Sequence, residues 1–183
     1  EPPGPCCFIL TVKRFRSLLP TVRSRSQHIR LQAPAPTKAI NTLVEGGIDE
    51  EIAPVLAAIV GTDVDAALEK VEQGAGEILS TLRQAIASPD LGEVTDIAED
   101  IGNPRPRADL TCQLLSVELR NQLAHLQGAG QRAHLGEALP SIKLPNIISA
   151  ITRLEELQKK SMFNPNLRLG LESVLLCLKG SHS

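Results

Sequence analysis

The chain has 183 residues but no Trp, no Tyr and only three Phe. Sequence-tolerant binding of single-stranded nucleic acid relies on aromatic platforms on which bases stack, so this scarcity argues against that function. The hydrophobic residues, 42% of the chain, are sufficient to fill the cores of one or two domains. Because those cores must consist of Leu, Ile, Val and Ala, we expect a mainly helical protein.

Long apolar runs are also lacking. The sequence has no stretch of about 18 uncharged apolar residues that could cross a membrane, and the short apolar run at 6–12 lacks the context of a signal peptide. We therefore expect a soluble, cytoplasmic protein without a membrane partner. The cysteines show neither paired Cys-x-x-Cys spacing nor nearby histidines of zinc-ligand type, so we interpret them as reduced thiols that serve as small apolar residues: Cys6, Cys7, Cys112 and Cys177.

The residue patterns that support catalysis are absent as well. There is no Gly-rich phosphate loop, no pair of carboxylates in a recognisable frame and no nucleophile elbow. The histidines are scattered, and ordinary surface or packing roles suit each of them: His28, His125, His134 and His182. We expect no chemistry from this chain alone, and no metal ion or cofactor bound to it.

The charged residues are segregated along the chain, although the net charge is only -2. Residues 1–31 carry six bases against the single acid Glu1, and residues 45–101 carry fourteen acids against Lys70 and Arg83. Residues 102–183 carry ten bases against six acids. The basic first block suits backbone phosphates, but the acidic middle block would repel them, so direct contact with DNA has weak support.

The first 33 residues have the pattern of an α/β segment. The apolar run 6–12 is typical of a buried strand, the alternation at 27–31 is typical of a second strand, and a short helix broken at Pro20 is predicted within 17–24. Two short strands do not make a stable sheet by themselves. We therefore interpret the segment as the end of a larger domain whose earlier strands would precede Glu1. Pro34 and Pro36 mark a linker after it.

Beyond the linker, helix signals follow one another to the end of the chain. The break at 102–106, which reads Gly-Asn-Pro-Arg-Pro, is interpreted as a second domain boundary. Capping residues, glycine stops and apolar spacings of three and four predict the following helices: 37–44, a segment capped by Asp49 that ends at 60, 64–73 capped by Thr62 or Asp63, 77–87, 91–101, 108–127, one opened by Pro145 and Asn146, and a last one capped by Asn164 with Pro165 in its first position.

Four segments carry a resemblance to a known family. Residues 8–11 read Phe-Ile-Leu-Thr, and residues 18–27 read Leu-Leu-Pro-Thr-Val-Arg-Ser-Arg-Ser-Gln. This order of strand, Pro-Thr turn and Ser-Arg element resembles the end of the nucleotide-binding domain in clamp-loader proteins of the AAA+ class, which serve bacterial DNA polymerase III. Val22 and Ser26 are conservative departures from an isoleucine and a cysteine in the family pattern. Residues 61–68 resemble the family's lid, and residues 164–176 resemble its closing helix.

The resemblance implies roles for three residues. Arg25 matches an arginine finger that reaches across a subunit boundary to the γ-phosphate of ATP in the neighbouring subunit, a role that suits a permanently charged guanidinium. Ser24 in the same Ser-Arg element, and Thr11 at the sensor-1 position, are implied to lie near nucleotide. From the residues alone, Arg23, Arg25 and Arg30 also fit a solvated basic edge, and Thr11 also fits a β-branched strand residue.

The resemblance also implies an architecture and a function. It places the end of an AAA+ domain at 1–33, a helical lid with connecting helices at 34–103, and a C-terminal helical collar at 104–183. In the collar, partner subunits would cover one apolar stripe: Leu167, Leu171, Val174, Leu175 and Leu178. A lid with no basic residue between Gly61 and Leu68 fits a subunit that does not hydrolyse ATP.

The function implied is assistance in ATP-dependent loading of the sliding clamp on primed DNA during DNA replication. Its partners would be the other clamp-loader subunits, the clamp and, indirectly, the primed DNA, with ATP held by the neighbouring subunit. Two alternatives remain open. One is an ATP-hydrolysing subunit of the same family, which an upstream phosphate loop would support. The other is a stand-alone helical interaction module in which the closing helix is central to a monomeric bundle.

Overall fold

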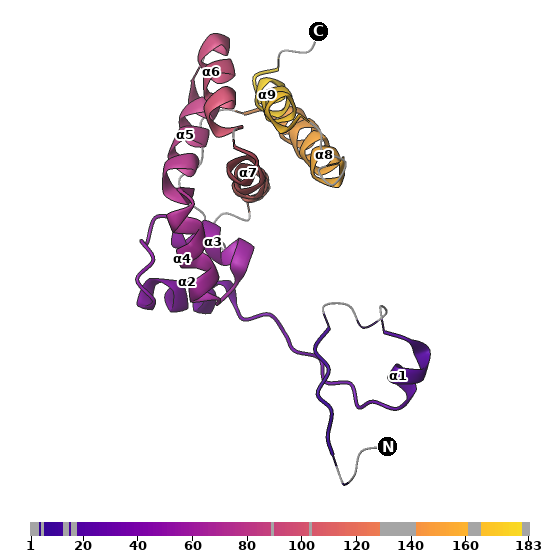
Figure 1. The fold of residues 1–183 in the computed structure, drawn as a ribbon. Coiled ribbons are helices and arrows are strands. Elements are labelled where there is room, and N and C mark those ends of the chain that lie inside the picture. The colour runs from indigo at the N-terminus through magenta and orange to yellow at the C-terminus, as the bar shows by residue number, and fades with distance from the viewer. Residues whose placement is uncertain are drawn as a thin grey trace. The chain divides into compact units, whose positions relative to one another are not determined.

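The computed structural model describes residues 4, 6–12, 15, 18–88, 90–102, 104–128, 142–160 and 166–180. In these residues the regular secondary structure is helical, as the composition predicted (Figure 1). The chain divides into two compact units, Glu1–Ala33 and Pro34–Ser183. The helices are α1 (Pro20–Ser24), α2 (Pro36–Glu45), α3 (Ala53–Val60), α4 (Val64–Glu72), α5 (Ala75–Ala87), α6 (Leu91–Ile101), α7 (Arg105–Leu126), α8 (Leu144–Lys160) and α9 (Leu167–Leu178).

In the first unit, the two predicted strands are not formed. Residues 6–12 and 27–31 are irregular chain, and their large apolar side chains are mostly exposed, with Ile9 at 88% and Leu31 at 87%. A strand is stable only when its backbone groups pair along a ladder, and no described segment of this unit pairs with either run. The prediction of a buried strand at 6–12 is therefore wrong here.

α1 begins at Pro20 and is not broken by it. Leu19 is the N-cap and Pro20 occupies the first turn, where the missing N–H of proline would have had no helical partner in any case. The helix of five residues ends at Ser24, and Arg25 is its C-cap. The sequence therefore predicted the presence of this helix but misjudged the effect of the proline.

The first helices of the second unit begin and end at local signals. The Asp63 side chain caps α4 by accepting the Ala66 N–H at 3.0 Å. Gly74, with φ of 85°, separates α4 from α5. Asp49 is not the cap that was predicted for α3, because this helix begins four residues later at Ala53. The Asp49 carboxylate instead accepts the Glu51 N–H at 2.8 Å and stabilises the turn that precedes the helix.

α6 spans the predicted residues 91–101, whereas α5 and α7 begin two and three residues earlier than predicted. Pro106 does not interrupt α7 because it lies in the first turn. Across the break between α6 and α7, the Thr111 hydroxyl donates to the Ile101 carbonyl at 3.1 Å. α7 is central to the unit, since it packs against α3, α5, α6, α8 and α9 (Figure 1).

α8 and α9 form an antiparallel pair. The Asn146 amide near the start of α8 donates to the Leu178 carbonyl at the end of α9 at 3.2 Å, and Gly170 near the start of α9 lies against the Leu157 side chain. The N-cap of α9 is Asn166, whose side chain accepts the Leu169 N–H at 3.2 Å. The predicted cap was therefore two residues too early; Asn164 and Pro165 themselves lie outside the described residues.

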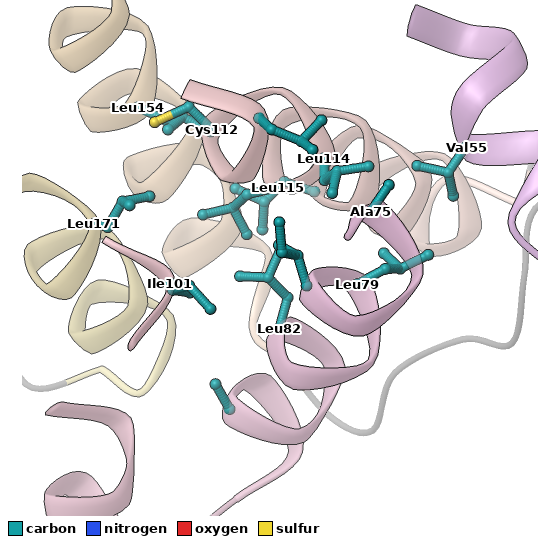
Figure 2. Close-up of a cluster of buried hydrophobic side chains, with 14 of the residues drawn as sticks. Val55, Ala75, Leu79, Leu82, Ile101, Cys112, Leu114, Leu115, Leu154 and Leu171 are labelled. Carbon is teal, nitrogen blue, oxygen red and sulfur yellow. The ribbon is translucent and has the colours of Figure 1, made fainter. Parts of the chain in front are cut away.

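The buried side chains of the second unit form one cluster that extends from Leu43 to Leu178. Figure 2 shows Leu82 of α5 and Leu115 of α7 in this cluster, together with Ile101 of α6, Leu154 of α8 and Leu171 of α9. The predicted stripe of α9 is buried here along its length, and its cover comes mainly from α6, α7 and α8 of the same chain. This is the packing that the monomeric-bundle alternative predicts.

Candidate functional site

The residues around Arg25 are held by a set of short-range hydrogen bonds. The Arg25 N–H donates to the Val22 carbonyl at 3.2 Å. The Ser24 hydroxyl donates to the Thr21 carbonyl at 3.1 Å, and the Ser26 hydroxyl donates to the Val22 carbonyl at 2.7 Å. The serines on both sides of Arg25 are thus bound back to α1. This fixes the backbone that carries Arg25, and it leaves the Ser24 oxygen able to accept but not to donate elsewhere.

The two arginines of the motif have different surroundings. The Arg23 guanidinium lies over the Phe15 ring, 4.8 Å from its centroid, and the Phe15 ring stacks on His28 with centroids 4.1 Å apart. A cation over an aromatic face is held by the ring's electron density. By contrast, the exposed Arg25 guanidinium makes no hydrogen bond or ion pair with any residue that the structure describes. The described residues of this unit contain no Asp or Glu, so neither arginine has an acidic partner there, and the two differ in the aromatic contact of Arg23.

Thr11, the third predicted site residue, lies on the irregular segment 6–12 and is exposed. Within the described residues it makes no hydrogen bond to Ser24 or Arg25. The structure thus brings Ser24 and Arg25 together at the end of α1 and does not join Thr11 to them. The strand that was predicted to carry Thr11 is not formed in the described chain, so no regular element there positions Thr11 near Arg25.

The lid-like segment 61–68 forms the junction of α3 and α4. Gly61 ends α3 with φ of 70°, and Asp63 caps α4. The charged residues of the segment, Asp63 and Asp65, are both acidic. Neither can stabilise a phosphate, because both carry the same sign of charge as the phosphate oxygens.

The second unit also contains a pocket that was not predicted from the sequence, and it lies between the turn at 47–52, α4 and α5. Its volume is about 380 Å³. Acidic residues Asp49 and Glu51 line it together with Arg83, and the rest of its wall is mainly apolar: Ile48, Ile52, Leu68, Val71 and Leu79. Leu68 and Val71 are three residues apart on a helix otherwise rich in acids. This spacing is the signal in the sequence that indicates an apolar face on α4.

Arg83 connects this pocket to a carboxylate in the core. Its guanidinium lies 3.1 Å from Glu51 at the surface and 3.8 Å from Glu118 on α7. The Glu118 side chain is almost fully buried, and the Gln122 amide also donates to it at 3.3 Å. A buried carboxylate requires such partners, so Arg83 stabilises the core as well as lining the pocket.

The cysteines are all free, and they fall into two groups. Cys6 and Cys7 are exposed, whereas Cys112 and Cys177 are buried. Burial, assisted by the nearby Asp109 charge, raises the pKa of the Cys112 thiol to about 12. Cys112 is therefore a neutral core residue at physiological pH, which agrees with its interpretation as a small apolar residue. Cys6 and Cys7 are exposed, so they do not pack as apolar residues.

Neither a metal centre nor a membrane span is found in the described residues. No group of three or more His, Cys, Asp or Glu side chains there is arranged to hold a metal ion. No helix in the same part of the chain is both long and apolar enough to cross a bilayer.

No model of a known protein family matches the chain, and no curated protein and no solved structure matches it. The functional argument therefore depends on the residues and on the geometry around them.

Proposed function

We propose that the chain is a clamp-loader subunit of the AAA+ class, which assists ATP-dependent loading of the sliding clamp on primed DNA in bacterial DNA replication. Within that class, the proposal is the delta-prime subunit of the DNA polymerase III holoenzyme, which does not hydrolyse ATP. The motif at 18–27 supports the class. The acidic segment 61–68 supports delta-prime over the motor subunits gamma and tau, because those subunits carry an arginine in the lid.

The difference between Arg23 and Arg25 carries the proposal. A solvated basic edge would leave both guanidinium groups in similar surroundings, but Arg23 lies over the Phe15 ring, whereas Arg25 is exposed and makes no such contact with the described residues. An arginine that stabilises the transition state of a neighbour's ATP must be able to present its guanidinium to the phosphate oxygens instead of holding it against its own unit. It must also stand on a fixed backbone, which the Ser24 and Ser26 hydrogen bonds provide.

The proposed chain would work by assembly. Its neighbours would be gamma or tau, whose bound ATP receives Arg25, and delta; together they would open and release the clamp, and DNA would be reached indirectly. The second unit would serve as a rigid support, because its core is continuous from α2 to α9. No chemistry is assigned to the chain itself.

The test is ATP turnover by a complex reconstituted from this chain and candidate clamp-loader subunits. Arg25→Ala should lower turnover while gel filtration shows an intact complex. An arginine finger is worth roughly a thousandfold or more in GTPases, but a ring with several ATP sites should lose only part of its rate because one junction is altered. Arg25→Lys should not restore the rate, since an ammonium cannot bind two phosphate oxygens in a planar fork.

The matched control is Arg23→Ala, which removes the same type of side chain two residues away. It should leave turnover close to that of the unaltered complex. If Arg23→Ala and Arg25→Ala lower turnover equally, or if Arg25→Ala has no effect, then Arg25 belongs to a solvated basic edge and the proposed role is wrong.

A second candidate is a self-contained helical interaction protein, which the burial of the α9 stripe within its own chain favours. Sedimentation equilibrium separates the two candidates. A clamp-loader subunit should form a stoichiometric complex with gamma or tau and delta, whereas a self-contained module should remain monomeric in their presence.

A further inference from the structure

The pocket between α4 and α5 is a short groove with three walls. α5 contributes Gly76, Leu79 and Arg83, whose spacings of three and four residues place them on one helix face. α4 contributes Leu68 and Val71, which are three residues apart, and the turn at 47–52 closes the third side. The volume of about 380 Å³ lies within the range of roughly 300–1,000 Å³ that is usual for ligand-binding clefts.

Part of the solvent-exposed wall of the groove is apolar. Leu68 is 40% exposed and Val71 is 41% exposed, whereas Ile48 and Leu79 are buried. Covering exposed apolar side chains next to an apolar floor is favourable by about 25 cal/mol for each Å² removed from water. At Gly76 no side chain projects from α5, and an added Cβ would meet nothing nearer than an Ile52 methyl group at 3.8 Å. A second helix can therefore approach the α5 backbone closely at this point.

The chain segment that forms the groove carries a net negative charge. Residues 45–83 contain nine acids and only two bases, Lys70 and Arg83. Arg83 pairs with Glu51 at the surface and with Glu118 in the core, so the charges of Arg83 and Glu51 offset each other for an incoming ligand. Asp49 and Glu51 line the groove. Glu72 is four residues after Leu68 and therefore lies on the same side of α4.

We propose that this groove docks a basic amphipathic helix from a partner protein. Apolar side chains of that helix would cover Leu68 and Val71, and its Lys or Arg side chains would lie against Asp49 and Glu72. The inference does not rest on the clamp-loader proposal. The groove lies in the second unit and Arg25 lies in the first, so either proposal can fail without the other.

The probe is a fluorescein-labelled synthetic peptide of Leu and Lys, about 18 residues long so that it can form a helix. Fluorescence anisotropy with the full chain should show saturable binding of one peptide per chain, and the affinity should fall as salt is added. A matched peptide with Glu in place of every Lys has the same apolar face and the opposite charge. It should bind at least about tenfold more weakly, because it would meet like charges at the rim.

Two substitutions test whether the peptide binds at the groove. Val71→Lys places a base on the apolar wall and should weaken the Leu/Lys peptide by about tenfold or more. The fold should tolerate it, because the side chain is already partly exposed. The control is Ile148→Lys on α8, which is 51% exposed and forms no wall of the groove. It makes the same change of charge and should leave the affinity unaltered.

Four outcomes would overturn the proposal. The first is the absence of saturable binding, the second is equal binding of the Lys and Glu peptides, and the third is equal effects of Val71→Lys and Ile148→Lys on the affinity. The fourth is concentration-dependent self-association that Val71→Lys abolishes, which would assign the groove to a second copy of this chain.

Discussion

Leu171→Ala should lower the unfolding free energy of the second unit by about 2–5 kcal/mol, because Leu171 is a fully buried residue of α9. The substitution removes three carbon atoms, and at about 0.8 kcal/mol for each buried methylene the transfer contribution alone is about 2.4 kcal/mol. The remainder comes from the cavity. α6, α7 and α8 all pack against α9, so the side chains around Leu171 can move only slightly to fill the space.

The measurement is urea unfolding followed by far-UV circular dichroism. Leu169→Ala is the matched control: it is the same change in the same helix, so helix propensity cancels, but Leu169 is 57% exposed. It should cost about 0.5 kcal/mol or less. Each variant should be measured at two protein concentrations about tenfold apart, because a helix covered by a second chain would unfold at a concentration-dependent midpoint.

The reasoning is refuted if Leu171→Ala costs no more than Leu169→Ala. It is also refuted if the midpoint of the unaltered protein rises with protein concentration. The first result would show that Leu171 is not enclosed by its own chain, and the second would show that a second copy of the chain covers part of the fold.

Two further predictions concern the packing of α6 on α9 and the Cys112 thiol. Gly102→Ala should cost about 1–3 kcal/mol in thermal unfolding, because an added Cβ would lie 2.6 Å from the Ala98 carbonyl oxygen and 2.9 Å from the Arg168 Cα. Gly92→Ala, whose Cβ would meet nothing nearer than 3.3 Å, should change stability little, and equal losses in the two variants would contradict the close approach. In the folded state the pKa of the Cys112 thiol is raised from 9.0 to about 12, so the folded chain keeps a proton that the unfolded chain releases. The free energy of unfolding should therefore fall as pH rises from about 9 toward 12, by up to about 1.4 kcal/mol per pH unit. Urea titrations across this range should show the slope and Cys112→Ala should remove it; a slope that persists in the variant would assign it to another group.

The sequence predicted helices best where the start and the end both carry a local signal. α6 lies between Asp90, which accepts the Gly92 N–H at 2.8 Å, and Gly102. α4 lies between Asp63 and Gly74. In both cases the capping group and the helix are within a few residues of each other, so the pattern contains nearly all the physics that sets the boundary.

The predictions failed where a distant segment decides the outcome. The run 6–12 has β-prone residues, but β propensity is realised only when a neighbouring strand supplies the other half of the ladder. The stripe of α9 was also recognised, yet periodicity gives only the width of an apolar face and not the identity of the segment that covers it. The groove combines the turn at 47–52 with α4 and α5, and only the tertiary packing of these segments creates it.

The burial of the α9 stripe limits how the proposed clamp-loader assembly could form. A stable interface usually buries about 800 Å² on each partner, and residues already in the chain's own core cannot contribute to that area. If partner subunits do contact this helical pair, they must use its outer surface, where Ile148 and Leu169 are exposed. Substitutions in the stripe would reduce assembly only by unfolding the chain, as expected for Leu171. Loss of assembly can therefore be attributed to an interface only for substitutions on the outer surface, where the fold survives the change.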